Sequence, residues 1–507
     1  MSKRKKRIRG QPKIEVKNSG YSEGGASVTK KSLKTYQPRH YSAKEDIDRN
    51  LQTLRNRAHD LAINSAVGAG AINVETTNVI GAGLKLFPRI KQNVLGVSAE
   101  YARQWSRQVK NEFELWAGNA LACDYLRRNN FYELQRIAFI SSLIEGDSFS
   151  LFKRRLPTRE NPYSLRLQII EAGRVSNPMT GLTLMINNVE MRHGKNRIVN
   201  GIEVNGEGAL EAIWVANRQW NEFNALDAEL KWQRVRFFGE KTGCRNVLHI
   251  CTDTRPDQFR GVPFLAPVID SLKQVSRYSD AELTSAIIKS FFSVFFVQSL
   301  NNFSLNEITG SKDEIDVTEY KLGSGTVSAL PRGVDVKAID SKNAQNVFDS
   351  FLTNFLKQIG SGLGVPYEVL MKNFTSSYSA SRAALLQAAD EFRQRKKFFV
   401  NDFCRPVYEN FLTEAITLGR IDAPGFFDSA EKKAAWLNAE WYNEQTKGID
   451  AVKEAEGIRR QIELGLTTRE KAAAELNGVD FWENVEMLAE ENRKMSEIIL
   501  SNGQDAK

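Results

Sequence analysis

Residues 260–296 read RGVPFLAPVIDSLKQVSRYSDAELTSAIIKSFFSVFF, and this stretch decides the fold. From Phe264 to Phe296 the apolar residues recur every three or four positions, the spacing of a stripe along one face of an α-helix. Pro263 and Pro267 fit only a first turn, because proline lacks the backbone N–H that later turns need. The sequence therefore predicts a long helix over Phe264–Phe296.

The chain that follows predicts a short β interlude and a second helix. Residues 299–340 are rich in Gly, Ser, Asn and Thr, and 326–330 and 334–339 suit short strands. A second apolar stripe starts at Ser341 and predicts a helix that ends at Gly360 and Gly362. A small polar loop over Asn373–Ser381 is then expected, with a charged helix from Arg382.

Three blocks within this region carry a resemblance. They are RGVPFLAPVIDSLKQVSRYSDAEL (260–283), GLGVPYEVL (362–370) and SYSASRAALLQAADEFRQRKKFF (377–399). In order and chemistry they resemble the portal proteins of tailed bacteriophages of the lambda family. Weaker similarity in 57–86 and 451–480 extends the resemblance over most of the chain outside the first forty residues.

The resemblance implies an α+β, mainly helical portal fold. Its parts would be a basic disordered arm (1–41), an α+β wing (42–262), a first stem helix (263–296), a small β clip (297–340), a second stem helix (341–363), a channel loop with a long wing helix (364–425) and a helical crown (426–507).

The resemblance also implies a function. Such proteins form a ring, commonly of twelve subunits, at the portal vertex of the virion capsid, after assembly in the host cytoplasm. Double-stranded DNA passes through the ring during packaging and ejection. The implied partners are further copies of the chain, the terminase large subunit, a head-completion or adaptor protein and the major capsid protein.

Two candidate sites follow from the resemblance. The DNA-channel loop would comprise Lys372, Asn373, Thr375, Ser376, Ser377, Tyr378, Ser379, Ser381 and Arg382. Small hydroxyl and amide groups there would touch the DNA backbone weakly without fixing its register. The clip surface that docks partners would include Asp313, Glu314, Asp316, Glu319 and Tyr320. The alternative to the channel loop is a plain loop between two helices. The alternative to the docking surface is an acidic patch that is only solvated.

The positive charge is concentrated at the start of the chain. The formal net charge is +9, but residues 1–40 hold 12 Lys or Arg and only 2 acidic residues. The remainder holds 58 basic and 59 acidic residues and is nearly neutral. A near-neutral body suits a conduit through which DNA slides, since each cationic contact to phosphate adds salt-dependent affinity. The basic arm is either a non-specific contact to phosphate or a partner, or a flexible solubilising tail. Its cations are Lys3, Arg4, Lys5, Lys6, Arg7 and Arg9.

Upstream of Arg260 the pattern predicts helices followed by strands. Helices are expected after the Ser42–Glu45 capping box, over Ala66–Val79, after Ser98 and over Phe131–Ile144. Strands are expected over 84–87, 148–152, 165–170, 201–204, 210–215 and 246–251. The C-terminal part predicts helices over 430–443, 452–464 and 481–500, and one after a Thr467–Glu470 capping box.

No motif for catalysis, a cofactor or a metal is present in the sequence. The phosphate-binding string GxxxxGK followed by Ser or Thr is absent, and so is the nucleophile motif GxSxG. The spacing of Cys244, His249 and Cys251 does not match a structural zinc site. We therefore expect a protein that is not an enzyme, with no cofactor and no metal.

Cysteine content and hydropathy indicate a protein of the reduced cytoplasm that does not enter a membrane. Four cysteines in 507 residues are too few for a disulfide scaffold. No apolar segment follows the N-terminal basic run, so a signal peptide is not expected. The most apolar run, Ile287–Leu300, is shorter than the roughly 20 residues of a membrane span and contains Lys289, which favours a buried helix.

Two other classes of function stay open from the residues alone. One is a nucleic-acid enzyme or a non-catalytic nucleic-acid-binding protein anchored by the basic arm. The other is a minor head scaffold protein without a channel, which shares much of the same composition.

Overall fold

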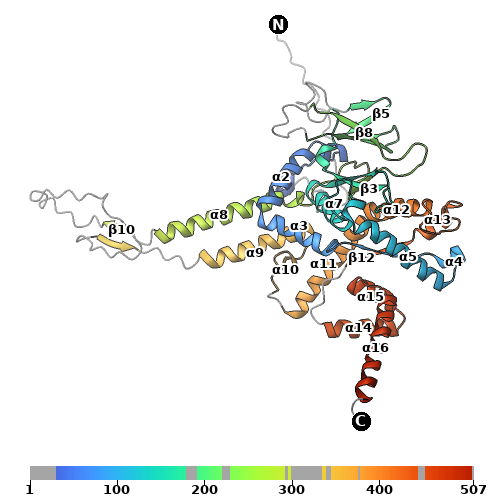
Figure 1. Ribbon diagram of the computed structural model, residues 1–507. Helices are drawn as coiled ribbons and strands as arrows, with labels where there is room; N and C mark the ends of the chain where they lie inside the picture. The colour runs from blue at the N-terminus through green and yellow to red at the C-terminus, as the bar shows by residue number, and fades with distance from the viewer. Residues whose placement is uncertain are drawn as a thin grey trace, which may run out of the picture.

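The computed structural model describes residues 30–178, 191–219, 229–291, 295–298, 334–337, 344–374, 377–443 and 451–504. Figure 1 shows a central body of helices and small sheets. The sheet that contains β5 and β8 lies at one side of it, and the C-terminal helices lie at the opposite side. The helices α8 and α9 project together away from the body. The predicted α+β, mainly helical class is confirmed.

The body is built from helices that each bury one face. In α5 (Ala99–Ala117) the aromatic side chains of one face are core: Phe113 is 1% exposed and meets Phe131 and Phe411 edge-on at centroid distances of 5.5 and 5.1 Å. Such edge-to-face pairs add to the burial of the rings. The other long helices of the body are α2 (Leu51–Asn64), α3 (Ala66–Val79), α7 (Phe131–Glu145), α11 (Tyr378–Phe399) and α12 (Arg405–Thr417).

Several predicted helix boundaries are confirmed by their capping contacts. The Ser42 hydroxyl accepts a hydrogen bond from the Glu45 N–H at 3.3 Å, and the Glu45 carboxylate accepts one from the Ser42 N–H at 3.4 Å. The Ser98 hydroxyl accepts from the Tyr101 N–H at 3.1 Å at the start of α5. The short helical segments are α1 (Lys31–Lys34), α4 (Gln92–Leu95), α6 (Ala120–Cys123), α10 (Tyr367–Leu370), α13 (Ala430–Trp436), two π-helical turns (Lys44–Asp48 and Val400–Cys404) and two 3₁₀ turns (Ala172–Arg174 and Ala266–Val268).

Eight of the described strands form two antiparallel sheets of three and five strands. The three-stranded sheet has the order β3-β2-β9, from β2 (Asp147–Arg154), β3 (Leu165–Ile170) and β9 (Val247–Cys251). The five-stranded sheet runs β4-β5-β6-β7-β8, from β4 (Met191–His193), β5 (Asn196–Val199), β6 (Ile202–Val204), β7 (Leu210–Ala216) and β8 (Trp232–Arg236). The predicted strands at β2, β3, β6, β7 and β9 are confirmed, whereas β4, β5 and β8 were not predicted.

The projecting part is an antiparallel pair of helices with a short β-ladder beyond it. α8 (Ile269–Phe291) leads away from the body and α9 (Ala344–Leu363) returns (Figure 1). β10 (Phe295–Gln298) pairs with β11 (Val334–Lys337), which confirms the second predicted strand of the interlude. The strand predicted over 326–330 lies outside the described residues.

Three predictions about this pair are wrong. The first helix ends at Phe291, and Phe295 and Phe296 pair in a strand instead. The run Ile287–Leu300 is therefore no single buried helix, and Ile287 itself is 48% exposed. The second helix passes through Gly360 and Gly362 and ends at Leu363, because the burial of Ile359 and Leu363 outweighs the weak helix propensity of glycine.

The helix predicted over Ala430–Asn443 is also wrong in its second half. α13 ends at Trp436, and β12 (Ala439–Tyr442) pairs with β1 (Lys85–Pro88) from the other end of the chain. Trp441 in β12 is buried in the body core. This long-range pairing overrides local helix propensity.

The chain closes with three helices beyond residue 450. They are α14 (Ala451–Glu463), α15 (Arg469–Asn477) and α16 (Phe481–Gln504). The cap of α15 is Thr468, which accepts from the Lys471 N–H at 3.2 Å, and not the predicted Thr467.

Candidate functional site

The segment between α9 and α11 turns sharply twice. Gly364 ends α9 at φ +71°, in the left-handed region that glycine enters without a Cβ penalty. The short helix α10 follows Pro366. Lys372 then adopts φ +53°, which is uncommon for a residue other than glycine. The backbone thus turns between α9, α10 and α11, and the Arg395 end of α11, rather than its start, meets the end of α9.

The second of these turns presents polar and aromatic groups to solvent. Lys372, Asn373 and Phe374 are exposed, the phenyl ring to 48%. The Asn373 N–H donates to the Glu368 carbonyl at 3.0 Å, which fixes the backbone while these three side chains remain exposed.

The polar loop is shorter than predicted. α11 begins at Tyr378, with the Ser377 hydroxyl accepting from the Ala380 N–H at 3.4 Å, so the helix start predicted at Arg382 is wrong. A serine hydroxyl at this place satisfies one of the free N–H groups of the first turn. Of the predicted loop residues, Tyr378, Ser379, Ser381 and Arg382 are helical, while Thr375 and Ser376 lie outside the described residues.

Arg382 faces the C-terminal helices. It lines a hollow of about 280 Å³ whose wall includes Lys453 and Glu454 from α14 and Glu475 from α15. Its neighbour Ser381 is only 5% exposed. Arg382 therefore lies against α14 and α15 as well as in the first turns of α11.

α11 is fixed to the body and to the base of the helix pair by Arg395. Its guanidinium pairs with the fully buried carboxylate of Glu75 on α3 and donates to the Leu363 carbonyl at 2.9 Å. It also lies 4.8 Å from the ring centre of Phe264, a favourable cation–π distance. Burial raises the pKa of Glu75, and Arg395 opposes that rise. One side chain thus joins α3, α9 and the segment that leads into α8.

The entry to α8 is held by a buried network around Asp147. Arg260 donates from Nε to the Asp147 Oδ2 at 2.6 Å, and Arg55 donates from Nη2 to Oδ1 at 2.6 Å. Burial by itself would raise the pKa of Asp147, but Arg260 and Arg55 hold it well below its usual range. Sequence reasoning missed this network, although Asp147 directly follows the helix-ending Gly146 and Arg260 opens the first block of the resemblance.

The glycine of the same block is required by close packing. A Cβ atom on Gly261 would lie 1.9 Å from the Gly146 carbonyl oxygen, and one on Gly146 would lie 2.4 Å from the Gly261 oxygen. The two backbones therefore touch, which fixes the point from which α8 leaves the body.

The helix pair is bound internally by aromatic rings and leaves apolar side chains outside. Tyr278 on α8 meets Phe348 and Phe351 on α9 at 5.4 and 4.7 Å. Phe351, Leu283 and Ile287 are nevertheless 43%, 62% and 48% exposed. An elongated element with exposed apolar side chains is typical of a surface that another protein copy covers.

Comparison with known proteins identifies the family. Residues 29–396, which include the elements from α1 to most of α11, match the model of the phage portal protein, lambda family. The chain belongs to this family. It acts as a portal protein of a phage capsid.

Relatives of this portal-family chain match along nearly its whole length. It is 25% identical over 493 residues to portal protein B of Escherichia phage lambda, covering 92% of this chain and 88% of that protein. The same identity and coverage hold for the portal protein of Escherichia phage N15. Solved structures of a gene transfer agent virion and of its neck, the latter computed with C12 symmetry, are similar at 12% identity and TM-scores of 0.41 and 0.40. They cover 84% and 83% of this chain and 92% of each matched chain.

Two sets of predicted site residues of this portal-family chain lie outside the described residues. They are the clip residues Asp313, Glu314, Asp316, Glu319 and Tyr320, and the arm residues Lys3, Arg4, Lys5, Lys6, Arg7 and Arg9. Among the helices that the structure does describe, none combines the length and apolar character needed to cross a lipid bilayer.

The side chains of Cys244, His249 and Cys251 each have a local role in the structure. His249 stacks on Phe149 at 4.5 Å and approaches the Asp147 carboxylate at 3.3 Å. Cys244 is exposed, and the Cys251 thiol donates to the Asp253 carboxylate at 3.4 Å. Within the described ranges, these three are not among the groups of potential metal ligands that meet within 4.8 Å.

Proposed function

We propose that copies of this chain close into a ring whose α8–α9 pairs pack side by side around a channel for double-stranded DNA. The observation that carries the proposal is the exposed apolar surface of Leu283, Ile287 and Phe351 on a helix pair that projects from the body. Covering such surface stabilises association by about 25 cal/mol per Å² of apolar area. In a closed ring each pair covers its neighbour, so no apolar edge remains.

The proposal is tested by the mass and shape of the purified protein. We expect a ring with a central hole in negative-stain images and one high mass in native mass spectrometry. Leu283→Glu places a charge in the interface and should shift the protein toward monomers. The matched control is Leu156→Glu, because Leu156 is 90% exposed and lies between β2 and β3, outside the α8–α9 pair. A wild-type monomer, or equal assembly of both variants, would contradict the ring.

The turn between α10 and α11 is proposed as the channel-facing loop of this ring. Its exposed Lys372, Asn373 and Phe374 and the hydroxyl of Ser377 would make weak contacts to the DNA backbone. Removal of residues 374–376 should leave ring assembly unchanged, because the anchors of α11 at Ser377 and Arg395 remain. DNA packaging or retention should fall, and unchanged packaging would remove the proposed role.

The remaining parts are assigned by the same proposal. Residues 42–262 form the wing, α8 and α9 the stem, the segment between them the clip, and the helices beyond Asn443 the crown. The clip docks first the terminase large subunit and later a head-completion or adaptor protein. The terminase supplies the ATP hydrolysis, since the sequence of this chain contains no phosphate-binding motif. The wing meets the major capsid protein at the portal vertex, and assembly takes place in the host cytoplasm.

A further inference from the structure

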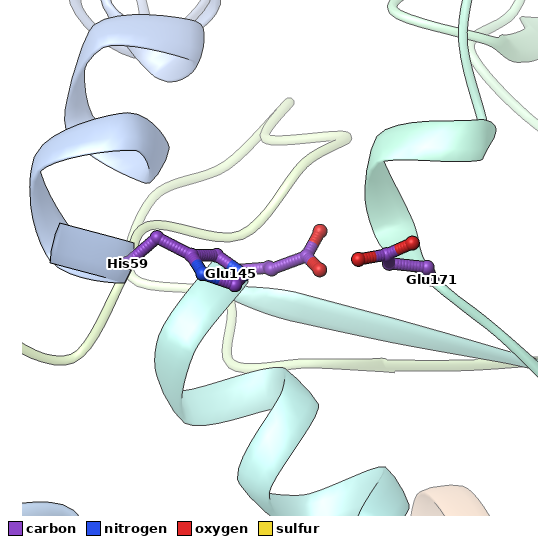
Figure 2. Close-up of side chains that lie close together, drawn as sticks. All are labelled: His59, Glu145 and Glu171. Carbon is purple, nitrogen blue, oxygen red and sulfur yellow. The ribbon is translucent and has the colours of Figure 1, made fainter. Parts of the chain in front are cut away.

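Three potential metal ligands from separate elements meet beside the Asp147 network. His59 lies on α2, Glu145 is the last residue of α7, and Glu171 follows β3. One ligand atom of each lies within 4.8 Å of those of the other two. Figure 2 shows the carboxylate of Glu145 pointing toward that of Glu171, with the imidazole of His59 beside the Glu145 side chain.

The central carboxylate of this cluster is buried without a partner. Glu145 is 5% exposed, and within the described part of the chain its carboxylate has no hydrogen bond or ion pair. Arg55 donates only to the backbone carbonyl of Glu145, at 2.8 Å, because its other nitrogen is paired with Asp147. Burial raises the pKa of Glu145 to about 7. Arg55 lowers this pKa, and the Glu171 carboxylate raises it further. A buried carboxylate without a direct ion-pair partner favours a cation beside it.

The donor set indicates which cation would fit. One imidazole nitrogen and two carboxylate oxygens suit a borderline divalent ion such as zinc, whereas magnesium and calcium prefer oxygen ligands alone. Two ligands at about 2.1 Å from one zinc ion lie roughly 3.4 Å apart in tetrahedral geometry. Since His59 and Glu171 are exposed, small rotations of their side chains can close the separation, and water can enter to fill the fourth position.

We propose that His59, Glu145 and Glu171 bind a divalent cation of the zinc class. The ion ties α2 to the end of α7 and to the segment that leads from β3 toward the five-stranded sheet. Asp60 of α2 also forms an ion pair with Lys273 of α8, at 3.8 Å. The site is thus a cross-link between the body and its neighbouring sheet, close to the base of α8.

Zinc binding by the full chain tests this directly. After treatment with a chelator, the protein is titrated with zinc chloride by calorimetry, and we expect one ion per chain at this site. His59→Ala and Glu171→Gln should each weaken that binding by about tenfold or more, since loss even of an outer partner typically weakens a metal site by 10- to 100-fold. Both residues are exposed, so neither change should disturb folding. His40→Ala and Glu160→Gln are the matched controls and should bind zinc as the wild type does.

Cobalt as a spectroscopic probe separates this site from binding by cysteine. Cobalt at His59, Glu145 and Glu171 gives weak visible bands without the intense near-ultraviolet band of a thiolate ligand, and Glu145→Gln should abolish those bands. Circular dichroism confirms that this buried variant is folded. Zinc affinity that is equal in the wild type and His59→Ala, or a cobalt spectrum with a thiolate band, would overturn the proposal. Ring assembly is measured separately and stays intact in either case.

Discussion

At the residue scale, Glu203 shows how one buried carboxylate organises the five-stranded sheet. Its oxygens accept from Arg234 Nε and Nη2 at 2.7 and 2.8 Å, from Asn196 at 2.7 Å and from the Trp214 indole at 3.2 Å. Burial opposes ionisation, but the hydrogen bonds of Arg234, Asn196 and His193 lower the pKa of Glu203 to about 2. The ionised form is therefore favoured in the folded sheet.

The pH dependence of stability follows from the sign of this shift. Because the folded pKa is depressed, the stabilisation is present above about pH 4.5 and is lost as the pH falls toward 2. We expect Glu203→Gln to lower the free energy of unfolding in urea by about 2–3 kcal/mol at pH 7, and by much less at pH 3. Glu207→Gln, in the exposed turn nearby, should change little at either pH. A loss that is constant with pH would show that the charge is not the cause.

At the element scale, the buried ion pair between Arg395 and Glu75 helps to position α11, beside the core residues Phe392 and Phe399. Arg395→Met removes the partner of the fully buried Glu75 and the hydrogen bond to Leu363. We expect thermal unfolding to show a loss of about 3 kcal/mol, since breaking a buried pair leaves an uncompensated charge. Adding Glu75→Gln should recover part of this loss.

The matched control lies two residues away on the same helix. Arg393 pairs with Asp390 at 2.7 Å, but both side chains are 75% exposed. Arg393→Met should therefore cost roughly 0–1 kcal/mol. Equal effects of the two substitutions would mean that the buried pair does not position α11.

At the scale of the whole molecule, charge is divided between the arm and the body. Residues 1–40 carry a net +10 and the remainder a net −1. We expect the full chain to bind duplex DNA with an affinity that falls steeply with salt, and a chain without residues 1–40 to bind weakly. Six cations in residues 3–9 correspond to a slope of about −5 in log affinity against log salt. Tight, salt-sensitive binding by the shortened chain would contradict a channel through which DNA slides.

The sequence alone determined the local elements and the family. The bounds of α3 and α7 were predicted within a residue, because glycines that interrupt helical backbone follow each of them, Gly81 and Gly83 after α3 and Gly146 after α7. The blocks beginning at Arg260 and Gly362 were sufficient to indicate the portal fold, since each combines helix pattern with glycine and proline at fixed places.

Only the tertiary structure decided the contacts between distant segments. β12 pairs with β1 more than 300 residues away, and Asp147 receives Arg55 and Arg260 from different elements. The meeting of His59, Glu145 and Glu171 depends on the same folding. No local pattern encodes such contacts, because they exist only when the packing of the body brings the backbones together, as at Gly146 and Gly261.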